Sequence, residues 1–368
     1  MAIAVLVLYF NVIANRGTFV FTQERTSNLQ PNKQSSCTGD VTFRRLQYQR
    51  LEDDNSRLSQ AVKGVILDSW KTPTKKQYET YLKQWDAYCK MRLKHPLNAD
   101  YAVALEFLNE LRKKGLSYSA INTARSALSS VLCVDKYGTD FGSNKLVCRF
   151  MKGIFNVRPS LPKYAAIWDP DVVLNFLSRM APRKRLTLKG LTTKTAMLFA
   201  LLTAQRVQTL HLIKLDNVSF TDDHVQIVFS DLLKTSRPNW HLEPIVFAKF
   251  DVCKSLCIFR YLRSYISKTK RIRGSENQLF VSYVKPHKPV VKTTIARWIR
   301  DLLHRAGIDV SMYKAHSTRA ASSSKASKYL PIEKILKAGG WSSSSSFMKH
   351  YNLPSMTSST SNVLLQNP

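Results

Sequence analysis

Apolar residues recur at three- and four-residue steps through the first half of the chain, which is the period of an amphipathic helix. One such stripe is carried by Tyr78, Leu82, Trp85 and Cys89. It follows a proline at position 73, a residue favoured at the first helical position. Similar stripes lie within 98–115, 117–132 and 145–154. These short helices predict a small helical bundle of about one hundred residues.

The pattern changes after Val157–Lys163, where two prolines and flanking charges interrupt the helical period. An apolar helix is predicted over Thr193–Thr203. Three short strands are then predicted over 218–220, 224–229 and 241–247, and helices resume from 251, over 293–306 and over 318–328. The second half is therefore predicted to be an α+β domain with a small sheet.

Together these patterns predict a mainly α protein with two folded domains. The predicted segments are a flexible basic arm over 1–57, a helical domain over 58–158, a linker over 159–165, an α+β domain over 166–355 and a flexible tail over 356–368. Residues 15–54 of the arm are polar and carry no sustained period, and the tail is rich in Ser and Thr, as is typical of unstructured chain.

The chain is strongly basic, with 56 Lys and Arg against 25 Asp and Glu and a formal charge of +31. Such an excess destabilises a compact state unless an anion offsets it, and nucleic acid is the leading partner. A membrane is not expected, because Met1–Ile13 is apolar but too short to span a bilayer and lacks the flanks of a signal peptide.

The sequence shows no metal site. Its six cysteines form no CxxC pair and no Cys/His cluster with zinc spacing, so we expect reduced thiols in an intracellular protein. No carboxylate cluster with magnesium spacing appears among the predicted strands, which argues against a two-metal nuclease or integrase.

Six residues of the second half, in one order, could supply a metal-free attack on a phosphodiester. They are Arg206, Lys234, His316, Arg319, Trp341 and Tyr351. Two guanidiniums can hold the non-bridging oxygens, a protonated lysine can donate to the leaving oxygen, and a tyrosine can act as nucleophile. His316 and Arg319 are three residues apart at a predicted helix start, so they share one face.

This ordered set resembles the tyrosine recombinase (phage integrase) superfamily, and most of all its eukaryotic mobile-element branch. The resemblance lies in Leu201–Leu210 around the first arginine, in Ala315–Ala320 around the second, and in Gly339-Gly340-Trp341 before Tyr351. It extends over roughly residues 60 to 355. It implies a SAM-like core-binding helical domain followed by an α+β tyrosine recombinase catalytic domain.

The resemblance also implies a role for each residue. Arg206 and Arg319 would clamp the phosphate, and Lys234 would be the general acid. The other three serve the nucleophile: Tyr351 would form a 3′-phosphotyrosine intermediate without any cofactor, His316 would take its proton or bond the phosphate, and Trp341 would donate its indole N–H or buttress the site.

Several positions leave alternatives open. The family usually carries an acidic residue three positions after the first arginine, where this chain has Thr209. Lys214 and Lys249 lie in the same region as the predicted acid and could replace it, and Tyr313 competes with the predicted nucleophile.

The implied partner is double-stranded DNA, bound by a homotetramer on two sites. Plausible phosphate contacts are Lys75, Lys76, Lys83, Arg112, Lys113 and Lys114. The basic hexamer Lys268–Arg273 is compatible with import into the nucleus. Two other functions stay open: a domesticated, catalytically impaired DNA-binding protein, which Thr209 favours, and a relaxase similar to type IB topoisomerases.

Overall fold

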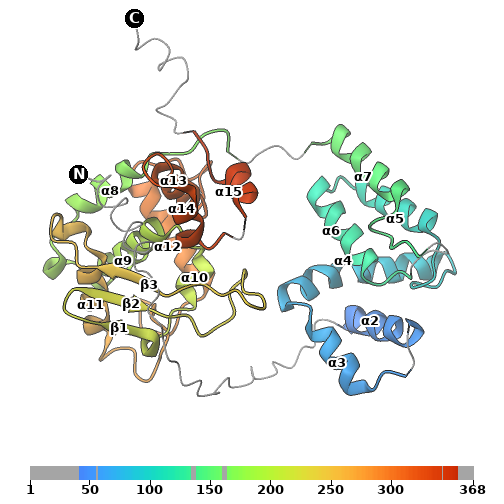
Figure 1. The fold of residues 1–368 in the computed structure, drawn as a ribbon, viewed down its shortest axis with the longest axis horizontal. Helices are drawn as coiled ribbons and strands as arrows, with labels where there is room; N and C mark the ends of the chain where they lie inside the picture. The colour runs from blue at the N-terminus through green and yellow to red at the C-terminus, as the bar shows by residue number, and fades with distance from the viewer. Residues whose placement is uncertain (1–40, 55–56, 134–137, 160–163, 342, 355–368) are drawn as a thin grey trace, which may run out of the picture. The chain divides into compact units, whose positions relative to one another are not determined.

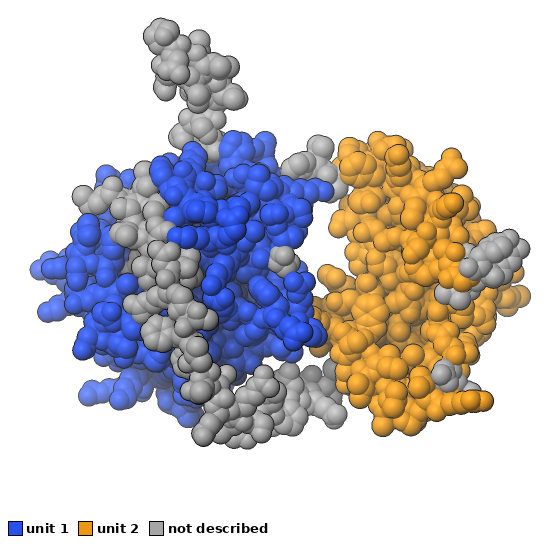
Figure 2. All heavy atoms as spheres, viewed as in Figure 1, with its two compact units in different colours: residues 1–23, 162–368 blue, residues 24–161 orange. Residues whose placement is uncertain are grey.

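The computed structural model describes residues 41–54, 57–133, 138–159, 164–341 and 343–354. The chain divides into two compact units between residues 161 and 162 (Figure 2). This division lies inside the predicted linker, of which residues 160–163 are outside the described ranges. Residues 1–40 of the predicted arm and the whole predicted tail also lie outside them.

The unit that comes first in the described chain is helical (Figure 1). It contains α2 (Val41–Asp54), α3 (Gln60–Asp68), α4 (Thr72–Met91), α5 (Tyr101–Lys113), α6 (Tyr118–Ser129) and α7 (Lys145–Val157). The side chains of Asp100, Ser117 and Asn144 cap α5, α6 and α7 by accepting backbone N–H groups of the first turn. The predicted apolar stripes face one core, in which Trp85 and Phe107 pack edge to face at 5.4 Å.

Residues 41–54 correct the prediction of a flexible arm over 1–57, because they form α2. Phe43 and Leu46 are buried in the same core as α4. The carboxylate of Glu79 accepts from the backbone N–H groups of Thr42 and Phe43, at 3.2 and 2.6 Å. The helix start is thus capped from 36 residues away, which a local sequence pattern does not reveal.

The second unit is mainly α with a small sheet, which confirms the predicted fold class (Figure 1). Its helices are α8 (Pro170–Arg179), α9 (Leu188–Thr203), α10 (Val207–His211), α11 (Ile258–Thr269), α12 (Lys292–Arg305), α13 (Ser317–Ala326), α14 (Ile332–Gly339) and α15 (Ser344–His350). Short 3-10 helices cover Arg183–Arg185, Leu215–Asn217 and Lys254–Leu256. In the described part of the chain, no helix combines the length and the apolar character that crossing a membrane would require.

The sheet is antiparallel in the order β1-β2-β3, with bounds Val218–Phe220, His224–Ile227 and Ile245–Ala248. Val225 of the central strand lies opposite Phe220 and Phe247. The second strand ends earlier and the third begins later than predicted, which leaves a long connection between them.

Helix α9 runs through the core of this unit and contacts α11, α12 and α13. The hydroxyls of its buried threonines find acceptors within the helix, since those of Thr195 and Thr203 donate to the carbonyls four residues earlier. Ala204 ends the helix with a left-handed backbone, φ 49°. The chain therefore turns immediately before Arg206, which begins α10.

A lysine is buried inside this core. Lys194 on α9 is fully buried, and its ammonium donates to the carbonyl of Leu177 at 2.6 Å. The ammonium also lies 4.5 Å from the ring centroid of Tyr261. Burial lowers the pKa of Lys194 from its ordinary value of 10.5 to about 8. The folded state therefore disfavours the charged lysine.

This burial predicts a pH-dependent stability. Below pH 8 the cost of burying the charge is present in full, and between about 8 and 10.5 the unfolded chain binds the extra proton, so stability rises with pH. The gain should be about 3 kcal/mol across that window. In Lys194→Met this part of the rise should disappear. Urea unfolding from pH 7.5 to 10.5 measures it, and an unchanged pH dependence in the variant would contradict the assignment.

Candidate active site

Helix α13 is the frame of the site. His316 begins it and Arg319 lies in its first turn. Two contacts tie α13 to the start of α8: the indole of Trp168 donates to the hydroxyl of Ser317 at 2.8 Å, and the ammonium of Lys325 pairs with Asp169 at 3.0 Å. Both ends of the helix are thus fixed.

Tyr351 follows α15 directly and meets α13 at two points. Its hydroxyl lies 3.1 Å from Nε2 of His316. Its backbone carbonyl accepts a hydrogen bond from the hydroxyl of Ser324, which itself accepts from the N–H of Leu353 at 2.9 Å. The phenol is therefore positioned from both its side chain and its backbone.

Arg319 joins three segments. It is fully buried, and its Nη1 donates to the carbonyls of Ala204 and Gly339 at 2.5 and 2.8 Å. The guanidinium lies 3.5 Å from the ring centroid of Trp341 and 5.1 Å from that of Tyr351. Among the described residues, its Nε and Nη2 atoms have no hydrogen-bond partner.

The charge on Arg319 is poorly compensated. Its pKa is lowered to about 9, mainly by burial and also by the nearby charge of Arg206, while Tyr351 acts in the opposite direction. A buried cation of this kind is stabilised when an anion enters, and a guanidinium binds the oxygens of phosphate with particular strength. The site is therefore suited to an oxyanion.

The glycines before Trp341 let its ring lie against the end of α14. A Cβ on Gly339 would be 1.7 Å from the indole ring, and Gly340 has a left-handed backbone with φ 66°. The ring packs edge to face on Tyr351 at 5.0 Å. Its Nε1 is buried and has no partner among the described residues, so a further donor is available to a ligand.

Arg206 is half-buried at the start of α10. Within the described ranges, no side-chain hydrogen bond or ion pair holds its guanidinium. Thr209, which stands where the family usually has an acid, donates instead to Oε1 of Gln205 at 3.2 Å. Arg206 acts on Arg319 through charge.

Lys234 is exposed in the long connection between β2 and β3. Its turn is closed by hydrogen bonds in both directions between Leu233 and Ser236, at 3.0 and 3.1 Å. The same connection reaches α14, where Glu243 pairs with Lys337 at 3.0 Å. Ring, hydrogen-bond and cation contacts join four of the predicted residues: His316, Arg319, Trp341 and Tyr351. Lys234 lies in a separate element.

The competing residues have other partners. Lys214 pairs with Asp231 at 2.8 Å, and Lys249 lies 3.7 Å from Asp251. Tyr313 is buried, which raises its pKa, and its hydroxyl donates to a backbone carbonyl at 3.0 Å. These contacts favour structural roles for all three competitors.

The predicted DNA contacts lie on α4 and at the end of α5. Lys75 and Lys83 pair with carboxylates, each at 3.2 Å, and Arg112 donates to Asn109 at 2.9 Å. The others, Lys76, Lys113 and Lys114, are exposed. Within the described ranges, no cluster of His, Cys, Asp and Glu could hold a metal ion.

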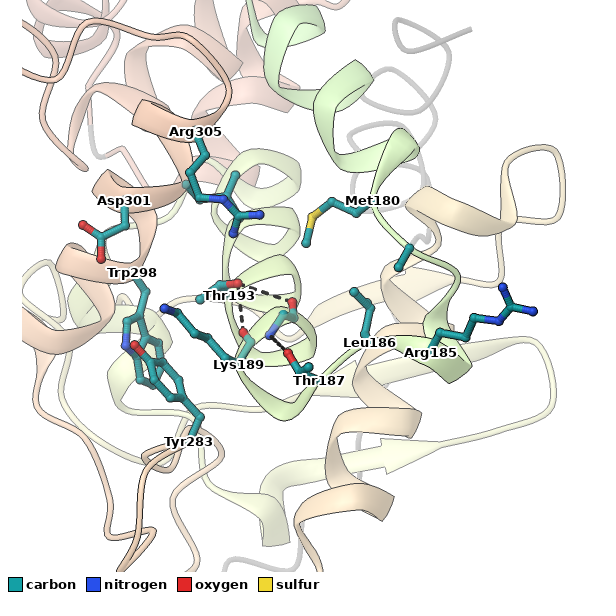
Figure 3. A pocket seen from close by; sticks show the side chains of 13 residues that line it. Met180, Arg185, Leu186, Thr187, Lys189, Thr193, Tyr283, Trp298, Asp301 and Arg305 are labelled. Atoms are coloured by element: carbon teal, nitrogen blue, oxygen red, sulfur yellow. Dashed lines mark hydrogen bonds between the residues drawn. The ribbon is translucent and has the colours of Figure 1, made fainter.

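A cavity of about 540 Å³ lies elsewhere in the second unit, between the start of α9 and α12 (Figure 3). Lys189, Tyr283, Trp298 and Arg305 are among its lining residues. None of the six predicted catalytic residues lines it. This cavity is therefore separate from the clustered donors.

Some residues of the site were not predicted. Ser324 holds the backbone of Tyr351, and Gln205 bonds both Thr209 and the end of α14. Serine and glutamine at these positions carry no local signal for their contacts with Tyr351 and Ala338, which lie 27 and 133 residues away. Gly339 belongs to the motif before Trp341, but the sequence does not show why a glycine is needed there. The structure does, because the indole ring of Trp341 occupies the space that a Cβ would need.

Comparison with known families gives one match. The model described as "Phage integrase family" matches residues 169–357, which is more than half of the chain. This stretch contains all six predicted catalytic residues. No curated protein matches the chain.

Solved structures show a similar fold. One is the Tn1549 transposon integrase in complex with transposon right end DNA, with a TM-score of 0.55, 13% identity, and coverage of 89% of this chain and 99% of that one. Another is the XerH site-specific recombinase bound to palindromic difH substrate, with a TM-score of 0.52, 14% identity, and coverage of 83% and 88%. At these identities the likeness concerns the fold.

The contact between Gly339 and Trp341 yields a prediction. Gly339→Ala should displace the indole and destabilise the protein by about 1–3 kcal/mol, as overpacking does. Gly153→Ala on α7 is the control, because nothing lies within 4 Å of its Cβ and the helix should gain stability. Thermal melting and near-ultraviolet circular dichroism measure both. Equal melting temperatures for the two variants would show that the indole position is wrong.

Proposed function

The chain belongs to the phage integrase family, and we propose that it is a site-specific DNA recombinase that works through a 3′-phosphotyrosine intermediate. One observation carries this proposal: the buried donors of Arg319 and Trp341 have no hydrogen-bond partner among the described residues, and both side chains lie beside a tyrosine whose hydroxyl is within hydrogen-bond distance of a histidine. Proteins with a similar fold include a recombinase and a transposon integrase bound to DNA.

In the proposed cleavage step, the oxygen of Tyr351 attacks the phosphorus as the bond to the 5′ oxygen breaks. The phenolic proton passes to His316, which lies within hydrogen-bond distance. Lys234 donates a proton to the leaving 5′ oxygen. Rejoining reverses these steps: a 5′-hydroxyl attacks the phosphotyrosine and the phenol is released. The phosphotyrosine ester keeps the energy of the broken phosphodiester bond, which is not hydrolysed, so the reaction needs no cofactor.

The arginines and the tryptophan stabilise the charge that develops on the phosphate. Arg319 supplies Nε and Nη2, and Trp341 supplies Nε1, all from buried positions. Arg206 brings a second guanidinium. Donors held in place before the reaction cost little reorganisation, and losing one commonly slows a reaction about 10²- to 10³-fold.

Reciprocal exchange sets the number of copies. Joining two duplexes to each other requires four strands to be cut, and each cut consumes one tyrosine. We therefore propose a homotetramer on two double-stranded DNA sites. The exposed Lys76, Lys113 and Lys114 are the proposed phosphate contacts of the helical unit, while Lys75, Lys83 and Arg112 would have to exchange their present partners.

We propose a nuclear location, for which the basic hexamer 268–273 is the sequence signal. The basic hexamer 268–273 gives little support, because Lys268 donates to the carbonyl of Leu186 at 2.8 Å. Arg273 is buried and donates to the carbonyls of Gln278 and Leu279. An import receptor needs such a segment to be extended and accessible.

Covalent trapping tests the nucleophile. On a DNA substrate nicked near the cleavage site, the wild-type protein should form an adduct that survives denaturation, and Tyr351→Phe should form none. Tyr313→Phe is the matched control: it should keep the adduct and lose only about 1 kcal/mol of stability with its hydrogen bond. Mass spectrometry of the adduct identifies the modified residue.

The other outcomes identify the alternatives. An adduct in Tyr351→Phe would refute the assignment. Salt-sensitive DNA binding by the wild type without any adduct would indicate a catalytically impaired DNA-binding protein, which the neutral Thr209 favours. Relaxation of supercoiled plasmid without pairing of sites would indicate a relaxase.

The charge predicts how DNA binding responds to salt. The logarithm of affinity should fall linearly with the logarithm of salt concentration. Replacing Lys113 and Lys114 with alanine should reduce the slope by about 2. Lys90→Ala is the control, because its ammonium pairs with Asp86 at 3.0 Å. Fluorescence anisotropy from 50 to 300 mM salt, a range chosen to span roughly one decade, measures the slopes, and a flat response would argue against DNA.

A further inference from the structure

We propose that Gln205 is a positioning residue that fixes Arg206 for its contact with the phosphate. This inference rests on the proposed function and deepens it. Gln205 precedes Arg206 directly and is 4% exposed, so its polar side chain is buried beside the site. A buried carboxamide requires partners for both its donor and its acceptor.

Both ends of that carboxamide are engaged. Nε2 donates to the carbonyl of Ala338 at 2.7 Å, and Oε1 accepts from the hydroxyl of Thr209 at 3.2 Å. The backbone N–H of Gln205 also donates to the hydroxyl of Thr203 at 3.2 Å. The side chain therefore links α10 to the end of α14, and the backbone N–H ties the same residue to the end of α9.

This link runs parallel to that of Arg319. Arg319 joins the carbonyls of Ala204 and Gly339, and Gln205 reaches the neighbouring carbonyl of Ala338. Two adjacent residues of one turn are thus tied to two adjacent residues of another. The amide also lies beside Gly340, whose added Cβ would be 3.8 Å from Nε2. The turn before Arg206 is fixed relative to the segment that carries the tryptophan.

Arg206 depends on this turn, because only its backbone is held among the described residues: its carbonyl accepts from the N–H of Thr209 at 2.8 Å. In the described part of the chain its guanidinium makes no side-chain hydrogen bond or ion pair. Its position before a phosphate binds therefore follows from its backbone, which the flanking Gln205 and the α10 residue Thr209 fix. This is the arrangement of a residue that acts through its neighbour.

The chemistry of the link explains why an amide is used. A carboxylate at position 205 could not donate to the carbonyl of Ala338, and its negative charge would offset the two guanidiniums. A neutral amide supplies one donor and one acceptor and leaves the charges of Arg206 and Arg319 for the phosphate. Gln205 therefore orients Arg206 without neutralising the positive charge of the two guanidiniums.

The test is single-turnover cleavage of the nicked substrate at saturating DNA. Gln205→Met keeps the shape and removes both hydrogen bonds, and it should slow cleavage roughly 10²-fold, as a misplaced group does. In an Arg206→Ala background the same change should have little further effect, because the residue that it positions is gone. Gln208→Met in α10 is the matched control, and this variant should cleave at the wild-type rate.

Each result of these cleavage measurements either upholds or overturns the inference. A wild-type rate for Gln205→Met, or an equal loss in both backgrounds, overturns the inference while the adduct of the wild type upholds the proposed function. Absence of that adduct overturns both. If Gln205→Met does not melt cooperatively, Thr209→Val replaces it: this change removes one hydroxyl and should give a smaller rate loss that again vanishes without Arg206. Persistence of its loss in the Arg206→Ala background overturns the inference.

Discussion

The buried guanidinium of Arg319 is the interaction on which the site depends. It ties the end of α9 to the end of α14 through two backbone carbonyls, and it lies close to the rings of Trp341 and Tyr351. Both carbonyls lie at helix ends, where the backbone dipole favours a positive charge. Segments from three parts of the chain thus meet at one cation.

The same residue is left incomplete, and this links stability to chemistry. A buried cation with unpartnered donors costs free energy in the empty protein. Trp341 adds a further unsatisfied donor, and Arg206 adds repulsion. Under the proposed function, a phosphate would accept hydrogen bonds from these donors and offset the charge of Arg206. The free energy that these buried groups cost without an anion would then be recovered when the transition state binds.

The sequence predicts the fold class and the cluster well where the signal is local. Amphipathic periods predicted α5, α6 and α7, and the order of the motifs pointed to the residues that the structure brings to Arg319. Long-range contacts could not be predicted. Glu79 caps a helix that begins at Val41, and Ser324 holds a tyrosine 27 residues away. The partner of Thr209 was equally hidden, because a hydroxyl gives no indication of which buried amide it will meet.

One feature of the site bears on how copies of the chain would cooperate. Tyr351 meets His316 of its own chain, and its backbone is fastened to the helix that carries that histidine. Under the proposed function, a single copy supplies both the nucleophile and the histidine that takes its proton. Assembly would then govern when strands change partners, whereas the ability to cut would belong to each copy alone.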